Sequence, residues 1–352
     1  MNNDINNDIN KVFVSVIVPM YNKESTIIRC LESLSEQKLK ELEIIVIDDG
    51  STDKSKELVE KYQKRDNRIK LISQENRGPG AARNVGIKAA SGECIGFVDC
   101  DDKLDSRMYE AMYCALQKTK SSVAVCQEKN VFYEKDGRCR VLSETHFPYK
   151  EITVCDREQM LDWFLNFKYL SLNSACFKLV KKSIFTEHNI WFPEDYRYAE
   201  DLTISGGIFS IAQRVAIVPE SLYIYIHDTG TFSTSYTIKK AQDVLEDLKD
   251  VLRYLKKIHY TGTVDNFILG MSFSSIRQIY GTEKKQERES KEAKELISTW
   301  KKMKKHRRPR FRGKKMPVFH KMKVLVAWMH MEAFTCKIIN LLSGVPFFRF
   351  MV

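Results

Sequence analysis

Short hydrophobic runs alternate with amphipathic stretches along the first hundred residues. The runs are rich in β-branched residues and have the length of buried strands; they cover residues 12–19, 43–48, 69–73 and 94–98. Between them, apolar residues recur at the spacing of one helical face, as Ile27, Leu31 and Leu34 do. This alternation predicts an α/β fold with a doubly wound, mostly parallel sheet.

The alternation weakens after Asp105 and gives way to a helical pattern. Residues 106–235 contain one helical stripe at 108–118 and one strand pattern at 123–127 among aromatic-rich segments. From Lys239 onward, apolar residues at helical spacing predict an appended α-helical region. We therefore expect four parts, which are 1–105, 106–235, 236–300 and 301–352.

Composition places the chain among ordinary globular proteins. Of its 352 residues, 43% are hydrophobic and 29% are charged, which excludes a largely disordered or fibrous chain. The nine cysteines form no C-x-x-C pair, so we expect reduced thiols in the cytosol. The first ten residues lack the basic and apolar regions of a secretory signal peptide, so we expect the protein to stay inside the cell.

Positive charge is concentrated in one segment near the C-terminus. Residues 301–323 contain twelve Lys or Arg and no acid, and without them the formal net charge of +11 becomes −1. The apolar stretch 324–342 is interrupted by His330, Glu332 and Lys337, so no conventional membrane span is expected.

Two interpretations of this basic segment are open. It contains no Trp or Tyr, which argues against binding of nucleic acid through base stacking. A polybasic segment beside an amphipathic stretch is typical of proteins that lie on an anionic membrane surface, and this is our expectation. The alternative is a solvated charged face beside a helix that packs on the body of the protein.

Polar side chains follow the predicted strands, and in open α/β sheets ligands bind at the carboxyl ends of strands. Pro19 and Tyr21 follow the first strand, and Asp48 and Asp49 end the second. Tyr21 suits stacking on a base, but a tyrosine in a loop also often serves only packing. Asp49 followed by Gly-Ser is also ordinary turn chemistry.

A glycine-containing loop, RGPGAARN at 77–84, opens the third predicted helix. The loop begins like a dinucleotide-binding fingerprint, but Arg83 stands where the third glycine is needed, which argues against a dehydrogenase. A helix N-terminus with an arginine in its first turns is a candidate anion site.

The fourth strand leads into Asp99, Asp101 and Asp102. Three carboxylates within four residues repel one another unless a cation lies among them. Oxygen ligands suit Mg²⁺ or Mn²⁺, and bound Mg²⁺ usually also contacts phosphate, so the pattern predicts a metal and a phosphate-bearing ligand. The alternative is an acidic turn that caps the next helix. Lys103 stands where the phosphatase-like haloacid-dehalogenase motif needs Thr or Val, which disfavours that class.

Two later features are further candidates. Glu200 and Asp201 precede an apolar-rich run, where they are either catalytic residues or the first turn of a helix. The helix dipole favours acids in a first turn. His227 ends the strand-like run YIYIH and suits a ligand, although a single histidine more often has a structural role.

Together these segments resemble the family 2 glycosyltransferases with the GT-A fold, which build bacterial surface polysaccharides. The resemblance covers about residues 12–230 and rests on five segments in the family's order: VIVPMYN (16–22), IDDGSTD (47–53), NRGPGAARN (76–84), FVDCDD (97–102) and ED (200–201). It implies that 1–105 is a nucleotide-sugar-binding half and 106–235 an acceptor-binding half, followed by a helical extension at 236–300.

The resemblance implies a binding site for a UDP-sugar donor. Tyr21 and Asp49, with Pro19 and Asp48 beside them, would hold the uracil and ribose, and Arg83 would support the nucleotide from the loop side.

The resemblance also implies a metal. Asp99 and Asp101 match the family's D-x-D motif, which contacts the ribose and Mn²⁺ or Mg²⁺. Asp102 and His227 are further candidates beside the metal and the diphosphate.

An inverting transfer follows from the family's mechanism. Asp201 would deprotonate the acceptor hydroxyl, which attacks C1 as UDP leaves, and Glu200 would position Asp201 or the acceptor. The Gln-x-x-Arg-Trp motif of processive synthases is absent from the sequence, so we expect one sugar per acceptor. The expected acceptor is a saccharide on polyprenyl diphosphate, which places the enzyme peripherally on the inner face of the plasma membrane.

Two alternatives from other classes stay open at this point. A nucleotidyltransferase shares the sheet and the metal, but usually has a Gly-rich loop with a Lys after the first strand. A catalytically inactive scaffold at the membrane is the other. The donor sugar, the linkage and the oligomeric state cannot be deduced from the sequence.

Overall fold

A computed structural model describes residues 11–133, 138–195, 198–227, 236–282, 285–310, 318–329, 331 and 335. The chain divides into two compact units. The first, here called the sheet unit, comprises residues 1–160, 174–195 and 207–231. The second, the helical unit, comprises residues 161–173, 196–206 and 232–352.

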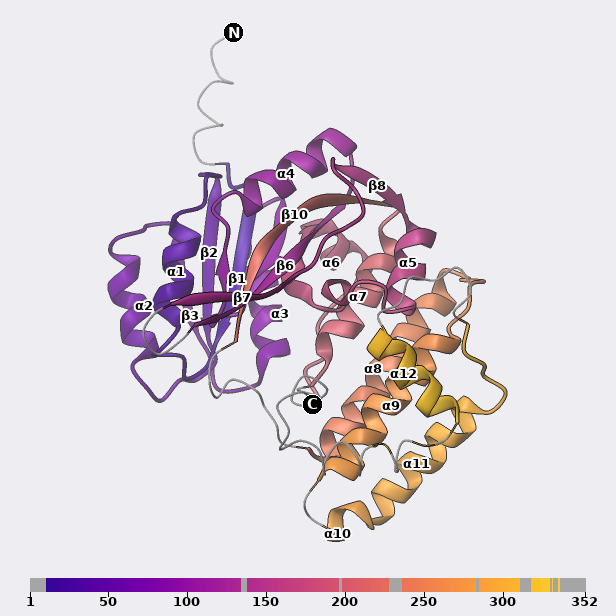
Figure 1. The fold of residues 1–352 in the computed structure, drawn as a ribbon. Coiled ribbons are helices and arrows are strands. Elements are labelled where there is room, and N and C mark those ends of the chain that lie inside the picture. The colour runs from indigo at the N-terminus through magenta and orange to yellow at the C-terminus, as the bar shows by residue number, and fades with distance from the viewer. Residues whose placement is uncertain are drawn as a thin grey trace. The chain divides into compact units, whose positions relative to one another are not determined.

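One sheet organises the described residues of the sheet unit (Figure 1). Its strands are β1 (Val14–Met20), β2 (Leu42–Asp48), β3 (Ile69–Ser73), β4 (Cys94–Phe97), β5 (Lys103–Leu104), β6 (Val123–Tyr133), β7 (Cys139–Glu144), β8 (Thr153–Asp156), β9 (Lys178–Lys181) and β10 (Arg214–His227). The order is β3-β2-β1-β4-β9-β6-β10-β5, with β7 beside β6 and β8 beside β10. Strands from both predicted halves, 1–105 and 106–235, therefore share one sheet.

The predicted α/β fold is confirmed, and its parallel core comprises β3, β2, β1 and β4. Beyond β4 the sheet is mixed. The four-residue strand β9 lies antiparallel to β4 on one side and to β6 on the other, and β6 pairs in parallel with β10. Strand β9 was not predicted from the sequence, because four residues are too few to show a periodic pattern.

Helices pack against this sheet where their apolar stripes meet it. The helices that lie wholly in the unit are α1 (Ile27–Ser35), α2 (Ser55–Gln63), α3 (Pro79–Ala89), α4 (Met108–Thr119) and α6 (Lys182–His188), with a 3₁₀ turn at Ala175–Phe177. The predicted stripe of α1 is buried at Ile27, Leu31 and Leu34. Helix α3 packs on β1 and β2, and a Cβ at Gly86 would lie 2.4 Å from Ile17 Cγ2, so glycine permits this close approach.

The helical unit is built around α9 (Asp265–Gly281). Its other elements are α8 (Ile238–Lys257), α10 (Lys285–Arg288), α11 (Lys291–Lys304), α12 (Val318–Trp328) and a 3₁₀ turn at Leu170–Asn173; α5 (Arg157–Leu165) and α7 (Glu200–Ile211) are divided between the units. Helices α8, α10, α11 and α12 all contact α9. Buried Trp300 of α11 donates to Ser275 Oγ of α9 at 2.8 Å, which fixes how these two helices meet.

Part of the basic segment folds onto the helical unit. Lys304 is buried, and its Nζ donates to the carbonyl oxygen of Ala327 at 2.9 Å. Arg307 and Arg310 pair with Asp265 at 3.0 and 3.2 Å. The expected boundary between 300 and 301 falls inside α11. Among the described residues, no helix has both the length and the apolarity needed to cross a membrane.

A buried acid ties together the amino ends of β1 and β2. Glu43 is 3% exposed. Its carboxylate accepts hydrogen bonds from Ser15 Oγ at 2.5 Å, Lys70 Nζ at 2.6 Å and the Ser91 backbone N–H at 2.6 Å. Burial by itself raises the pKa of Glu43, but the bonds from Lys70, Ser15 and Ser91 outweigh it and lower the pKa to about 2.

We predict that Glu43→Gln lowers the free energy of unfolding by about 3 kcal/mol near pH 7. A depressed pKa stabilises the fold above the ordinary value of 4.5, and this contribution is lost as the pH falls toward about 2. Urea denaturation of wild type and variant between pH 7 and pH 3 should show the difference shrinking below about pH 4.5. A difference that stays constant over this range would contradict the assignment.

Candidate active site

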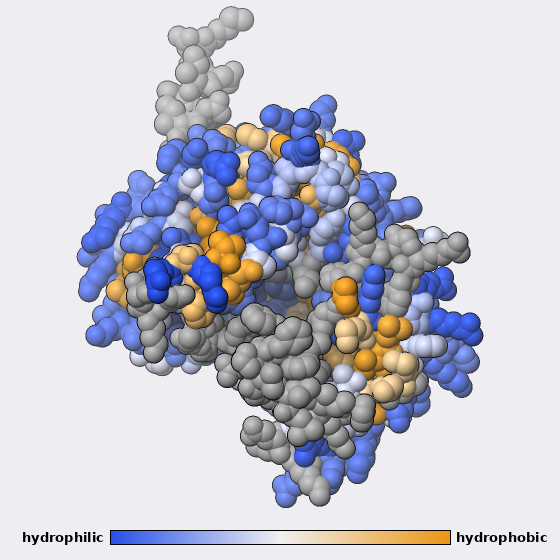
Figure 2. All heavy atoms as spheres, in the orientation of Figure 1, coloured by the Kyte–Doolittle hydropathy of each residue, from blue (hydrophilic) through white to orange (hydrophobic). Residues whose placement is uncertain are grey.

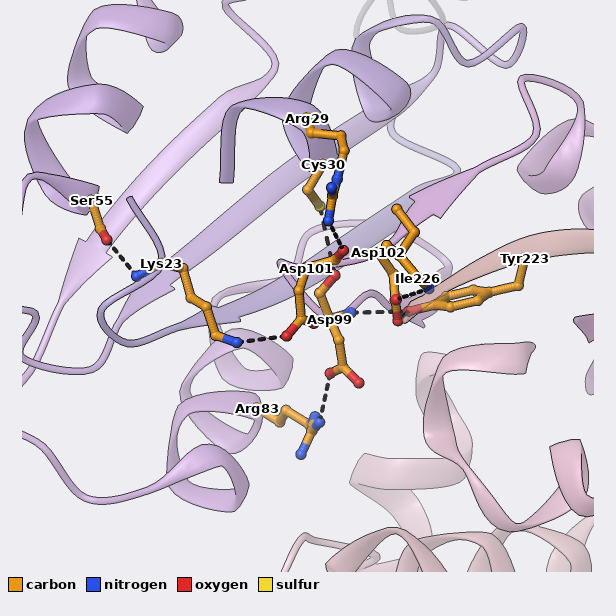
Figure 3. A network of polar contacts seen from close by, with 10 residues as sticks. All are labelled: Lys23, Arg29, Cys30, Ser55, Arg83, Asp99, Asp101, Asp102, Tyr223 and Ile226. Atoms are coloured by element: carbon orange, nitrogen blue, oxygen red, sulfur yellow. Dashed lines mark hydrogen bonds and ion pairs between the residues drawn. The ribbon is translucent and has the colours of Figure 1, made fainter. Parts of the chain in front are cut away.

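Three aspartates in the turn that follows β4 point in three directions (Figure 3). The Asp102 backbone N–H donates to the carbonyl oxygen of Asp99 at 3.0 Å, which closes the turn. Asp99 points to Arg83, Asp101 to Lys23, and Asp102 to Tyr223 and Ile226. Each carboxylate thus binds a different partner and points away from the other two.

Asp102 connects the turn to strand β10. Its side chain is buried, and its two carboxylate oxygens accept from Tyr223 Oη at 2.7 Å and from the Ile226 backbone N–H at 2.9 Å. Burial, reinforced by the nearby charge of Asp99, raises the pKa of Asp102 well above its ordinary value. In this arrangement Asp102, a predicted metal candidate, supports the turn from inside the core.

Arg83 of α3 lies beside Asp99. Its Nη2 donates to Asp99 Oδ1 at 2.9 Å, and its guanidinium lies 5.3 Å from the ring centroid of Phe192. The Arg83 side chain is 6% exposed, whereas that of Asp99 is 36% exposed. The structure therefore brings together two residues that the sequence placed at separate strand ends, and it fixes the arginine more firmly than the aspartate.

Asp101 receives two cations from the segment after β1. Lys23 Nζ lies 2.5 Å from Asp101 Oδ2, and Arg29 Nη2 donates to the Asp101 carbonyl oxygen at 2.6 Å. Burial lowers the pKa of Lys23, but the hydrogen bond to Asp101 and the negative charges of Asp101 and its neighbours together outweigh burial, so the pKa is raised. Sequence reasoning missed both cations. Lys23 follows the first strand, as Tyr21 does, and this position alone could have indicated that Lys23 lies at the site.

Asp48 and Asp49, at the end of β2, accept hydrogen bonds from the loops that precede α2 and α3. Asp49 accepts from Gln74 Nε2 at 2.7 Å and from the backbone N–H groups of Arg77 and Gly78 at 2.9 and 2.8 Å. Asp48 accepts from the Ser51 N–H at 3.0 Å. Both aspartates are buried, so in this structure they shape the loops that open α2 and α3. Tyr21 is 46% exposed and Pro19 partly buried.

A segment near residue 193 packs closely on the start of α3. The Asn84 amide exchanges hydrogen bonds of 2.8 and 2.9 Å with the backbone of Phe192, and it also donates to Glu194 at 3.0 Å. A Cβ at Gly80 would lie 2.4 Å from the Pro193 carbonyl oxygen, so only glycine fits there. Arg77 also pairs with Glu194. The contact between Asn84 and Glu194 was not predictable from local sequence patterns, because the two residues are 110 positions apart.

Glu200 and Asp201 form the first turn of α7, in the part of that helix that belongs to the helical unit. Glu200 is buried and Asp201 partly buried. Ala199, just before them, has φ = +67°, a left-handed conformation that costs about 1 kcal/mol or more in a residue with a side chain. Such strain is found preferentially at functional sites and was not visible in the sequence.

His227 ends β10, directly after the Ile226 N–H that binds Asp102. Its Nε2 lies 2.9 Å from Asn130 Oδ1. Burial lowers the pKa of His227, because it disfavours the charged imidazolium.

The carboxylates of Asp99 and Asp101 fit a metal better than that of Asp102 does. Their side chains are 36% and 25% exposed, whereas Asp102 is 2% exposed and bound to β10. Mg²⁺ commonly takes one or two carboxylates and completes its shell with phosphate and water. Within the described ranges, no group of three or more His, Cys, Asp or Glu side chains is placed to hold a metal ion. Asp99 and Asp101 are thus the two carboxylates of this turn that stay accessible to a ligand.

Comparison with known proteins assigns the family. The family model described as glycosyl transferase family 2 matches residues 15–188. Glycosyltransferase GlyG of Streptococcus pneumoniae is 32% identical over 238 residues, which cover 66% of this chain and 77% of GlyG. The chain belongs to glycosyltransferase family 2. It is therefore a glycosyltransferase, which confirms the predicted enzyme class.

Other glycosyltransferases match similar stretches. Glycosyltransferase EpsJ of Bacillus subtilis is 34% identical over 239 residues, so this chain spans 65% of EpsJ, and the match covers 65% of this chain. The crystal structure of Staphylococcus aureus TarS 1–349 in complex with UDP-GlcNAc superposes with a TM-score of 0.62 at 21% identity. It covers 94% of this chain and 91% of that structure, which confirms the expected GT-A fold and its helical C-terminal region.

We predict that Tyr223→Phe lowers the free energy of unfolding of this glycosyltransferase by about 1–3 kcal/mol, because it leaves the buried Asp102 carboxylate without one donor. Tyr225→Phe on the same strand is the matched control, since Tyr225 is 38% exposed. Chemical denaturation of both variants checks this. Equal effects of the two substitutions would show that the bond to Asp102 does not stabilise the turn.

Proposed function

We propose that this family 2 enzyme transfers a sugar from a UDP-sugar to a hydroxyl of a saccharide acceptor with inversion at the anomeric carbon. The observation that supports this most is the turn after β4, where Asp99 and Asp101 are partly exposed beside Arg83 and Lys23. Acids and cations alternate there, as a site for a metal and a diphosphate requires.

Relatives support the choice of donor. The TarS structure contains UDP-GlcNAc, and TarS is named a poly(ribitol-phosphate) β-N-acetylglucosaminyltransferase. A mannosyltransferase structure from Pyrobaculum calidifontis, with a TM-score of 0.50 at 17% identity, contains GDP-Man and Mn²⁺. We infer a UDP-sugar donor because exposed Tyr21 suits stacking on the uracil, while Asp48 and Asp49 shape the loop beside it.

Asp99 and Asp101 would hold Mn²⁺ or Mg²⁺ in this proposal. A bound divalent cation offsets the negative charge that develops on the leaving diphosphate. Asp102 keeps the turn in place through Tyr223 and Ile226. Arg83, stacked on Phe192, orients Asp99 and faces the nucleotide as a fixed cation.

Asp201 is the proposed general base. Asp201 is partly buried in the first turn of α7, and a carboxylate is a common general base toward a hydroxyl. Asp201 takes the proton of the acceptor hydroxyl as that oxygen attacks C1 and UDP departs. One carboxylate suffices for inversion, and Glu200 beside it helps to position Asp201 or the acceptor.

We predict that calorimetric titration detects UDP binding that depends on Mn²⁺, whereas GDP, CDP and ADP bind at least about tenfold more weakly. Asp101→Asn should abolish the effect of the metal, because it removes a metal ligand. Glu110→Gln, which neutralises an exposed acid on α4, is the control and should bind like wild type.

The same titration separates donor binding from catalysis. Asp201→Asn should bind UDP as wild type does, yet lose about 10²-fold or more in transfer, measured as UDP release with a panel of saccharide acceptors. If folded wild-type protein binds no nucleotide, the proposed donor site is wrong. If Asp201→Asn transfers normally, the proposed base is wrong.

We further propose that the acceptor is carried on a polyprenyl diphosphate and that the enzyme lies peripherally on the cytoplasmic face of the membrane. Helix α12 supports this, because it has two different apolar faces. Val324 and Ala327 pack into a core with Leu269 and Phe273 of α9. On the other face, hydrophobic residues are exposed at helical spacing and gather over α12 in Figure 2; they are Val318, Met322, Leu325, Trp328 and Met329.

We predict that Met322→Glu with Leu325→Glu reduces binding to vesicles of anionic lipid by about tenfold, because these side chains no longer enter the interface. Flotation with 30% phosphatidylserine and with neutral vesicles measures this. The control is Gln286→Glu with Ser298→Glu, which adds the same charge at exposed positions of α10 and α11. Equal flotation of the two double variants would exclude α12 as the membrane-binding face.

A further inference from the structure

Lys23 is held close to Asp101 by a rigid loop. The Lys23 backbone N–H donates to Ser55 Oγ at 2.7 Å. Its neighbours are bonded to the same β2–α2 loop, since Asn22 accepts from the Thr52 N–H at 2.8 Å and Glu24 from the Lys54 N–H at 3.0 Å. The main chain at residue 23 is therefore fixed, and only the four-carbon side chain has freedom to move.

Asp101 likewise has a fixed backbone and a side-chain carboxylate that can rotate. Arg29 holds the Asp101 carbonyl oxygen at 2.6 Å, which anchors the backbone and leaves the carboxylate to Lys23. The Lys23 and Asp101 side chains are 33% and 25% exposed, so their contact is open to a competing ligand. Arg83 differs, because its side chain is 6% exposed and stacked on Phe192.

We propose that Lys23 and a divalent cation are alternative partners of the Asp101 carboxylate. Without donor, the Lys23 ammonium neutralises Asp101 and blocks entry of free metal. When nucleotide and metal arrive together, Asp101 is released to the metal and the ammonium turns to the diphosphate. This rests on the proposed donor site, and it makes binding of metal and nucleotide interdependent.

The charge balance explains why both ligands are needed. A metal that binds alone displaces the Lys23 ammonium from Asp101 and leaves the ammonium without a negatively charged partner. When the metal arrives with a nucleotide, the phosphate oxygens accept hydrogen bonds from the displaced ammonium. Lys23 thus weakens the binding of metal alone and strengthens that of the nucleotide. A residue with a merely structural role would change both affinities in the same direction.

The test is titration of Mn²⁺ alone, followed by electron paramagnetic resonance of the free ion, with wild type, Lys23→Met, Lys23→Arg and Lys56→Met. Methionine keeps most of the length of the side chain and removes the charge, and exposed Lys56 of α2 is the control. We expect Lys23→Met to bind Mn²⁺ about fivefold more tightly than wild type. The Arg and Lys56 variants should bind it as wild type does. A parallel titration of UDP in saturating Mn²⁺ should show about fivefold weaker binding to Lys23→Met.

The outcomes separate this inference from the proposed function. If wild type binds UDP with Mn²⁺ but Lys23→Met binds Mn²⁺ alone no more tightly, competition at Asp101 is refuted and the donor site stands. If no variant binds UDP, the donor site is refuted, and tighter Mn²⁺ binding by Lys23→Met that is lost on adding Asp101→Asn still supports competition. Weaker binding of both ligands would show that Lys23 only maintains the loop.

Discussion

Mutual repulsion among Asp99, Asp101 and Asp102 is the constraint on which the site depends. Three carboxylates in one short turn remain together because each is drawn to a different element. Asp102 binds β10, Asp99 binds α3, and Asp101 binds the loop after β1. One turn therefore joins segments that are up to 124 residues apart in the chain, and loss of any partner leaves an acid whose charge acts on the other two.

The buried acids near the site differ from the partly exposed acids in the type of partner that they bind. Asp48, Asp49 and Asp102 are buried and accept from backbone N–H groups, which cannot leave without unfolding the loop. Asp99 and Asp101 are partly exposed and pair with side-chain cations. A side chain can change its partner at little cost, because only rotamers have to change. The turn after β4 thus combines one buried carboxylate, which is held by β10, with two partly exposed carboxylates within four residues.

The sequence allowed prediction of what depends on local pattern. The parallel strands, the stripe of α1 and the acidic turn at the end of β4 all follow from periodicity or from adjacency in the chain. Long-range pairing was not accessible in this way. Lys23 is 78 residues from Asp101, and Tyr223 is 121 residues from Asp102. The buried role of Asp102 also escaped prediction, because burial is decided by β10 rather than by the turn itself.

The basic segment shows that two interpretations of one sequence are physically compatible. Lys304 and Arg307 have partners within the helical unit, as a packed segment requires. Helix α12 buries Val324 while Leu325, one residue further and about 100° around the helix, stays 36% exposed. Because the buried and exposed faces use different side chains, contact of the outer face with lipid does not compete with packing on α9. Membrane binding in this form requires no unfolding, so its free energy is not reduced by the loss of core contacts.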